Sequence, residues 1–328
     1  MNEIETFVGL KHTSFRQYIR EESVTLECAL QTAVERDNTD ILSDLLKDIR
    51  DVNNHLEKTG LTILHTAAEC GSVKCASLML QHGANPNVWD NDTAVTPMHS
   101  AAKSFDNTIE LLELFVNNGG DLNSGLDKDG GSVLHAAVRA NNVQMVRFLL
   151  NQKVETIPKT FLETPLHTAA ENDNYEIASI LLESNPGCIN SLKKQTERLT
   201  PLHIVAEAGY SNTCEVLLNF GADVSLVNGQ CMTPVHLAAR NLNEPVLRKL
   251  LERGAYQNTK LVNTVDGDGR TPLFVCTSSK GRGATECMLT LIEFGAELDI
   301  QNDDGYTALH MAAIGKLQEI QIKSQKIF

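Results

Sequence analysis

Seven histidines recur at one position of a repeated motif, a pattern that metal binding or proton relay could use. They are His65, His99, His135, His167, His203, His236 and His310. Zinc requires its ligands to converge at roughly 2 Å from the ion. Packed helices lie about 10 Å apart, so units that each contribute one histidine cannot converge on a shared ion. We therefore expect each histidine to form a side-chain hydrogen bond that ties one connecting loop to the next.

Other segments that suggest chemistry lack the spacing that the chemistry requires. Asp266-Gly-Asp-Gly and Asn302-Asp-Asp-Gly resemble fragments of calcium loops, but neither continues to the glutamate of a twelve-residue loop. Lys280-Gly-Arg-Gly lacks the spacing of a phosphate-binding loop, which leaves a solvated loop or a contact with an anionic or lipid head group. No catalytic, cofactor-binding or metal-binding residue is expected, and the chain is not predicted to be an enzyme.

Eight cysteines are scattered along the chain without a C-x-x-C pair. A chain of this size does not need disulfides to fold, so reduced thiols are expected. Cys188 and Cys231 lie in connecting loops where a thiol is predicted to be accessible to electrophiles. Cys276 stands where other repeats have alanine and is predicted to be buried.

Composition excludes several classes of protein. The 328 residues include 42 acids and 28 bases, a net charge of −14, and binding to nucleic acid would need a basic face. No apolar run approaches the roughly 20 residues of a membrane-spanning helix, and residues 1–10 lack the pattern of a secretory signal. We expect a cytoplasmic chain that neither spans a membrane nor binds nucleic acid. Aromatic residues make up only 5% of it, which favours a core of closely packed helices.

The elements that position these residues recur eight times. Each copy begins with Thr or Ser, and successive starts lie 34, 36, 32, 36, 33, 38 and 36 residues apart, at Thr62, Thr96, Ser132, Thr164, Thr200, Thr233, Thr271 and Thr307. Thr followed by Pro starts a helix, two alanines allow a close neighbour, and a Leu-rich second helix follows. Glycine able to take positive φ ends that second helix, at Gly83, Gly119, Gly221, Gly254 and Gly295. Lys153 and Asn185 replace this glycine, which puts the turn geometry there in doubt.

The T-P-L-H-x-A-A motif of these copies resembles the ankyrin repeat over residues 26–313. The resemblance implies an all-α solenoid of stacked helix-turn-helix units, joined by β-hairpin loops that we call fingers. It divides the chain into an N-terminal extension (1–24), a degenerate N-capping repeat (25–57), seven repeats (58–302), and an incomplete last repeat with an atypical tail (303–328). A half-built last repeat would leave apolar surface uncovered, so limited stability is expected near the C-terminus.

The segment from Asp268 to Ala313 is also similar to the N-terminal cytosolic region of insect TRPA-type cation channels. This similarity implies a role in assembly, partner binding and coupling of stimuli to gating, at the cytosolic face of the plasma membrane. Without a pore the chain would be a truncated or alternatively terminated product. A free-standing adaptor that docks proteins is the alternative.

The expected function is protein binding, through finger residues that the repeat leaves free. These candidates are Trp89, Asp90, Asn91, Asp127, Lys128, Asp129, Lys193, Lys194, Arg198, Asp266, Asp268, Arg270, Asp303, Asp304 and Tyr306. Acidic residues are the largest group, seven of the fifteen, and the chain carries a net charge of −14, so we expect a protein partner with a basic surface, or other channel subunits. Trp89 either packs against the adjacent finger or contacts the partner, and the sequence does not decide between these.

Overall fold

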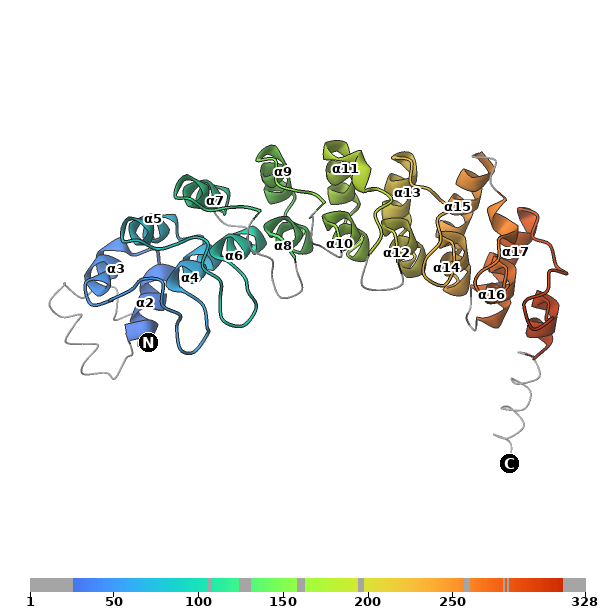
Figure 1. Ribbon diagram of the computed structural model, residues 1–328, viewed down its shortest axis with the longest axis horizontal. Helices are drawn as coiled ribbons and strands as arrows, with labels where there is room; N and C mark the ends of the chain where they lie inside the picture. Colours follow the sequence, from blue (N-terminus) through green and yellow to red (C-terminus); the bar gives the residue numbers. More distant parts are fainter. Residues whose placement is uncertain are drawn as a thin grey trace, which may run out of the picture. The chain divides into compact units, whose positions relative to one another are not determined.

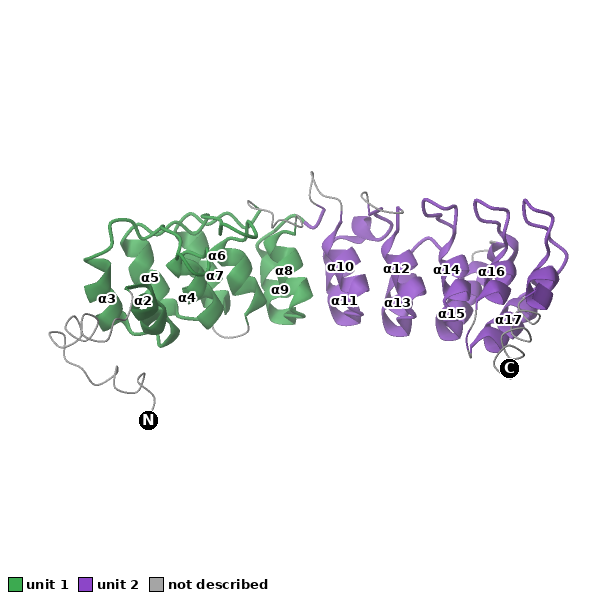
Figure 2. Ribbon diagram, turned by 90° about the horizontal axis from the view of Figure 1, so that it is seen from below, with its two compact units in different colours: residues 1–155 green, residues 156–328 purple. Residues whose placement is uncertain are grey.

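The computed structural model describes residues 26–104, 108–123, 131–157, 163–193, 198–256, 260–279, 281 and 283–314. The expected N-terminal extension and the tail after residue 314 lie outside these ranges. The chain forms two compact units, Met1–Glu155 and Thr156–Phe328 (Figure 2). Each unit consists of helix pairs joined by loops.

The described part of the first unit contains four helix pairs, whose helices form two rows (Figure 1). The first helices of the pairs are α2 (Leu26–Glu35), α4 (Ile63–Cys70), α6 (Pro97–Lys103) and α8 (Val133–Arg139). The second helices are α3 (Thr39–Leu46), α5 (Val73–Gln81), α7 (Thr108–Asn117) and α9 (Val143–Asn151). Each first helix packs on the first helix of the next pair, and the second helices do the same.

The second unit repeats this arrangement. Its first helices are α10 (Pro165–Glu171), α12 (Pro201–Ala208), α14 (Pro234–Arg240) and α16 (Pro272–Ser278). Its second helices are α11 (Tyr175–Ser184), α13 (Ser211–Asn219), α15 (Glu244–Tyr256) and α17 (Ala284–Glu293), with two 3₁₀ turns, η2 (Pro186–Cys188) and η3 (Leu261–Asn263). Residues 308–314 form a further helix after α17. The loops of this unit extend from one end of the helix pairs (Figure 2).

The first helices begin where the sequence predicts, because Thr or Ser precedes each of them from α4 to α16 as an N-cap in extended conformation. In the copies that contain histidine, the cap residue forms two hydrogen bonds with Nδ1 of the histidine three residues later, one through its hydroxyl and one through its backbone N–H. The Thr200 N–H donates to Nδ1 of His203 (3.2 Å), and the Thr200 hydroxyl lies 2.7 Å from the same atom. The hydroxyl and the backbone N–H at the start of the helix therefore both have hydrogen-bond partners within the motif itself.

The paired alanines allow neighbouring first helices to pack closely, as their small size predicts. Ala67, Ala101, Ala136, Ala169 and Ala238 are fully buried where first helices pack on one another. A larger side chain there would force the helices apart. Leucines of the second helices complete the core, and burying each contributes roughly 1.5–3 kcal/mol. Within each unit, each repeat therefore covers its apolar face with the next one.

The second helices end as predicted at four of the five glycines. Gly83, Gly119, Gly221 and Gly295 have φ of 86–89°. The prediction was wrong for Gly254, which is buried inside α15, because this helix continues to Tyr256. Its 13 residues make α15 the longest helix among the described residues.

The two non-glycine junctions differ from one another. Lys153 adopts φ of 59°, so the left-handed turn is kept without glycine. Asn185 instead is extended (φ −146°), and its side chain accepts a hydrogen bond from the Gly187 N–H as the chain enters η2. The usual left-handed turn is therefore absent at Asn185, as the missing glycine suggested. Lys153 keeps this turn, at the steric cost of an L-residue with positive φ.

The fingers are closed by hairpin-type backbone hydrogen bonds. Asp90 N–H donates to Val95 C=O (2.9 Å), and Asp266 N–H donates to Arg270 C=O (3.0 Å). Among the described residues the sole β-type pairing is an isolated bridge between His55 and Thr62. The described part of the chain is accordingly all-α, and the β character of the fingers is confined to their turns.

Candidate functional site

The recurrent histidines join neighbouring repeats. Nδ1 accepts the backbone N–H of the cap residue, so the neutral ring carries its proton on Nε2. Nε2 then donates to a carbonyl of the following finger, from His65 to Val95 (2.9 Å), His203 to Met232 (3.1 Å) and His236 to Arg270 (3.1 Å). His99 and His167 reach Gly131 and Leu199 in the same way. This link between fingers is the one that the spacing of the motif predicts.

Burial lowers the pKa of four of these rings and favours their neutral form. Burial lowers the pKa of His65 and His236, although hydrogen bonds to backbone carbonyls favour the charged form. For His167 and His203 burial lowers the pKa to about 4. A proton relay near neutral pH needs groups that change charge there. The histidines are therefore structural.

Two of the predicted surface residues, Asp90 and Asp266, are not free. The Asp90 carboxylate accepts hydrogen bonds from Thr93 and from the Val95 N–H (2.8 Å), and Asp90 is only 8% exposed. Burial opposes its ionisation, but these hydrogen bonds outweigh burial and lower its pKa. Asp266 is 5% exposed and accepts the N–H groups of Asp268 and Arg270. Both aspartates hold the turn of their own finger, which corrects the expectation that they lie on the surface.

Other predicted residues of the fingers are exposed. Trp89 is 60% exposed, and its carbonyl accepts a hydrogen bond from His55 Nε2 (2.7 Å). Its indole therefore stands outside the core, while its backbone joins the neighbouring finger. Asn91 lies next to it, and its N–H donates to Gly60 C=O (3.1 Å).

The last described finger of the second unit is also exposed. Asp303 and Asp304 are exposed there, and Asp303 N–H donates to Asp268 C=O of the preceding finger (3.1 Å). The ring of Tyr306 packs edge-on to His310, with centroids 6.0 Å apart. This finger presents two carboxylates and an aromatic ring beside one another.

Some of the predicted basic residues form ion pairs, and others are exposed to solvent. Lys193 is held between Glu163 (2.7 Å) and Glu171 (2.6 Å), whereas Arg198 is exposed. Asp127, Lys128, Asp129 and Lys194 lie outside the described residues. Because Trp89, Asp90 and Asn91 belong to the first unit and the other described candidates to the second, each unit has its own set.

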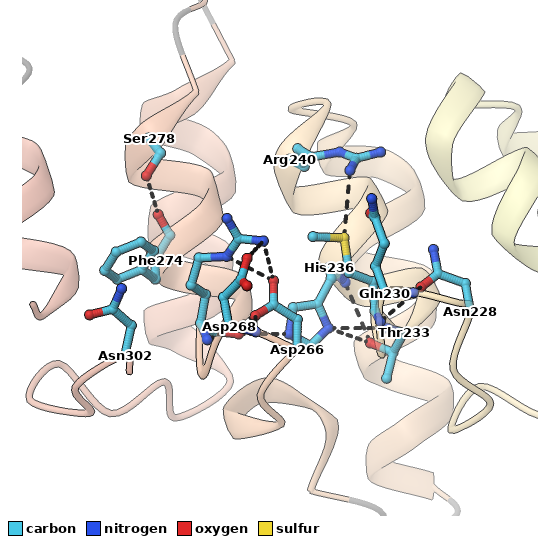
Figure 3. Close-up of polar contacts among 12 residues, drawn as sticks. Asn228, Gln230, Thr233, His236, Arg240, Asp266, Asp268, Phe274, Ser278 and Asn302 are labelled. Atoms are coloured by element: carbon cyan, nitrogen blue, oxygen red, sulfur yellow. Dashed lines mark hydrogen bonds and ion pairs between the residues drawn. The ribbon is translucent and has the colours of Figure 1, made fainter. Parts of the chain in front are cut away.

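A hollow of about 320 Å³ lies between the fingers and the first helices of the second unit. Arg240 and Arg270 face it, with Met232, Val275 and Ser279 among the other lining residues. Figure 3 shows Arg240 above the finger that carries Gln230. We call this hollow the α14–α16 groove.

Both arginines of the α14–α16 groove are oriented by carboxylates. Arg240 Nη2 binds Glu207 (2.9 Å) on the preceding first helix. Arg270 Nη2 binds Asp266 (2.9 Å) and Asp268 (2.7 Å) of its own finger. Figure 3 shows Asp266 and Asp268 of the latter cluster, with Asp266 close to His236. The groove is thus a preformed polar surface between two repeats.

Models of ankyrin repeats match residues 30–125, 98–194 and 185–261, and a second such model matches residues 278–318. The chain belongs to the ankyrin-repeat family. The expected family resemblance is thereby confirmed over most of the chain. In the described ankyrin repeats no helix is both long and apolar enough to cross a bilayer.

Three relatives contain similar ankyrin regions. The transient receptor potential channel pyrexia of Drosophila melanogaster is 35% identical over 127 residues, 38% of this chain and 13% of the channel. SH3 and multiple ankyrin repeat domains protein 2 of Homo sapiens is 32% identical over 189 residues, 57% of this chain and 10% of that protein. The E3 ubiquitin-protein ligase KEG of Arabidopsis thaliana is 25% identical over 314 residues, 92% of this chain and 19% of the ligase. The chain therefore spans less than a fifth of each relative.

The thiols of the ankyrin repeats are mostly buried. Cys276 is fully buried, as predicted, and Cys231 is exposed. The prediction that Cys188 is accessible was wrong, because the η2 turn buries it and raises the pKa of its thiol to about 11. Within the described ranges, no three His, Cys, Asp or Glu side chains gather closely enough to hold a metal ion.

Sequence reasoning missed Arg240, although the ankyrin motif contains a signal for it. The residue seven positions after the starting Thr or Ser changes from copy to copy, as Glu69, Lys103, Arg139, Glu171, Glu207, Arg240, Ser278 and Ile314. The residue before the Thr varies as well, and includes Met232 and Arg270. These two variable positions line the α14–α16 groove, so variation inside an otherwise constant motif marks the surface that differs between repeats.

Proposed function

We propose that this chain is a non-catalytic protein-interaction region with a role like that of the cytosolic ankyrin region of a TRPA-type, temperature-responsive cation channel. The similarity to pyrexia over 127 residues supports this proposal. The observation that carries the binding role is the pattern of exposure in the fingers. Trp89 is exposed, although the motif that follows it, residues 96–102, is buried, and Asp303, Asp304 and Tyr306 are exposed in the last described finger.

The proposed partner has a basic surface, because exposed carboxylates on the fingers attract Lys and Arg and increase the rate of encounter. The remaining surface candidates keep their proposed role: Asn91, Asp127, Lys128, Asp129, Lys193, Lys194, Arg198, Asp268 and Arg270. We further propose that residues 25–57 are a capping repeat, 58–302 seven repeats and 303–328 an incomplete one. The site of action in this proposal is the cytosol, at the plasma membrane when the chain assembles with channel subunits.

The second candidate function is a free-standing cytosolic adaptor. The similarity to SH3 and multiple ankyrin repeat domains protein 2 favours it, since that protein combines ankyrin repeats with other modules, as its name states. Both functions use the same fingers, and they differ in the partner.

Capture with the tagged chain from native cells separates the two. Recovery of channel subunits as the main bound protein supports the channel role, whereas a partner unrelated to channels supports the adaptor. Sequencing the transcripts of the gene adds an independent result. Transcripts whose reading frame also encodes six apolar helices support the channel role, and their absence from all transcripts contradicts it.

A further inference from the structure

The α14–α16 groove contains arginine N–H groups that have no oxygen acceptor. Arg240 Nη1 donates only to the Met232 sulfur, at 3.5 Å, and a thioether is a weak acceptor. The hydrogen bonds of Arg270 come from Nε and Nη2 and go to the aspartates of its finger. Both residues line the groove, and among the described contacts Nη1 of neither guanidinium has an oxygen acceptor.

The carboxylates behind the arginines fix their orientation. Glu207 lies on α12, next to α14, and Asp266 is buried within the finger that carries Arg270. A guanidinium that is oriented in advance loses little side-chain entropy when it binds a planar anion through two parallel hydrogen bonds. The groove is therefore prepared for an acceptor that approaches from solvent.

The hydrogen-bonding groups, and not the net charge, favour a carboxylate in this groove. Two arginines face three carboxylates, Glu207, Asp266 and Asp268, so the cluster carries one net negative charge. This charge opposes a dianionic phosphate more strongly than a single carboxylate, and the arginine N–H groups must supply the attraction. Met232 and Val275 supply apolar lining for the methylene groups of an acidic side chain.

We propose that the α14–α16 groove binds a Glu or Asp side chain of a protein partner, with the carboxylate between Arg240 and Arg270. This inference rests on the proposed protein-binding function and adds to it. The fingers bind basic residues of the partner, and the groove binds an acidic residue of the same partner. It accordingly assigns a specificity-determining role to Arg240.

Nuclear magnetic resonance of the full chain tests this assignment through the arginine Nε–Hε signals. The probes are N-acetyl-glutamate N-methylamide, the matched glutamine compound, and inorganic phosphate. We expect the glutamate probe to shift the signals of Arg240 and Arg270 saturably, and the glutamine compound to leave them unchanged. In Arg240→Gln the glutamate probe should bind about tenfold more weakly, equivalent to ~1.4 kcal/mol.

The Arg240 ion pair is partly exposed, so its loss should not prevent folding, and circular dichroism checks this. Arg240→Lys keeps the charge but loses the planar fork, and it should bind more weakly than the native chain. Arg253→Gln is the matched control, because Arg253 lies on α15 in a different hollow with Lys249 and Tyr256. Its affinity for the probe should equal that of the native chain.

Several results would overturn the proposal: equal shifts with both amino-acid probes, tighter binding of phosphate, no saturable shift, or unchanged affinity in Arg240→Gln. Each of these outcomes leaves the capture experiment unaffected, because capture depends on the finger carboxylates. Failure of this inference is therefore distinguishable from failure of the proposed function.

Discussion

At the residue scale, one histidine per repeat combines two structural tasks. His203 closes the first turn of α12 through Nδ1 and reaches the Met232 carbonyl of the next finger through Nε2. Because the ring is fully buried, each lost partner leaves a polar group without water to replace it. The stacking of helices and the position of the fingers therefore depend on the same side chain.

Replacing His203 with Ala should lower the free energy of unfolding by about 2–4 kcal/mol, because it leaves a cavity and unsatisfied buried groups. Urea denaturation provides the measurement. His310→Ala is the matched control, since His310 has the same Thr cap but is exposed, and it should cost less than about 1 kcal/mol. Equal losses in the two variants would contradict the role of the buried link.

The same histidines predict a loss of stability in acid. His167 and His203 have folded pKa values of about 4, below the ordinary value of 6.5. The unfolded chain therefore binds more protons between these values, and the stability that is present above pH 6.5 falls as the pH drops. Urea denaturation between pH 7 and 5 should show this fall, less steeply in the His167→Gln/His203→Gln double variant. A constant or rising free energy of unfolding on acidification would refute it.

At the element scale, the sequence determines most helix starts and fewer helix ends. Thr and Pro fix the first residue locally, which is why α6, α10, α12, α14 and α16 begin as predicted. The end of α15 does not follow from its glycine, because the interior of a helix tolerates glycine at modest cost when packing favours continuation. Arg240 was not predicted as a site residue, since its role depends on neighbours in two other repeats, Glu207 and Arg270.

The junction after α9 gives a prediction at this scale. Lys153→Gly should raise the free energy of unfolding by about 0.5–1 kcal/mol, because glycine adopts the positive φ of this turn without strain. Thermal unfolding followed by circular dichroism measures it. The reverse change, Gly221→Lys, should destabilise by a similar amount, since no atom crowds that position and only the backbone conformation matters. A loss of stability in Lys153→Gly would contradict this explanation.

At the scale of the whole molecule, stability in a repeat protein is a sum of contributions from units and their neighbours. The helix at residues 308–314 buries little, with Leu309 75% exposed, whereas Leu202 of α12 is almost fully buried. Hydrogen exchange monitored by mass spectrometry should therefore be faster in residues 308–314 than in α12. Equal protection of both helices would show that local burial does not control stability here.

The central claim is that exposed finger residues select a protein partner of this chain, and binding constants of charge-reversed variants test it most directly. Calorimetry with the captured partner would compare the native chain, Asp303→Lys/Asp304→Lys in a finger, and Glu183→Lys/Glu252→Lys on exposed positions of α11 and α15. We predict that the finger variant weakens binding about tenfold or more, with the helix variant near the native value. Equal affinity of all three proteins, or a loss only in the helix variant, would contradict the account.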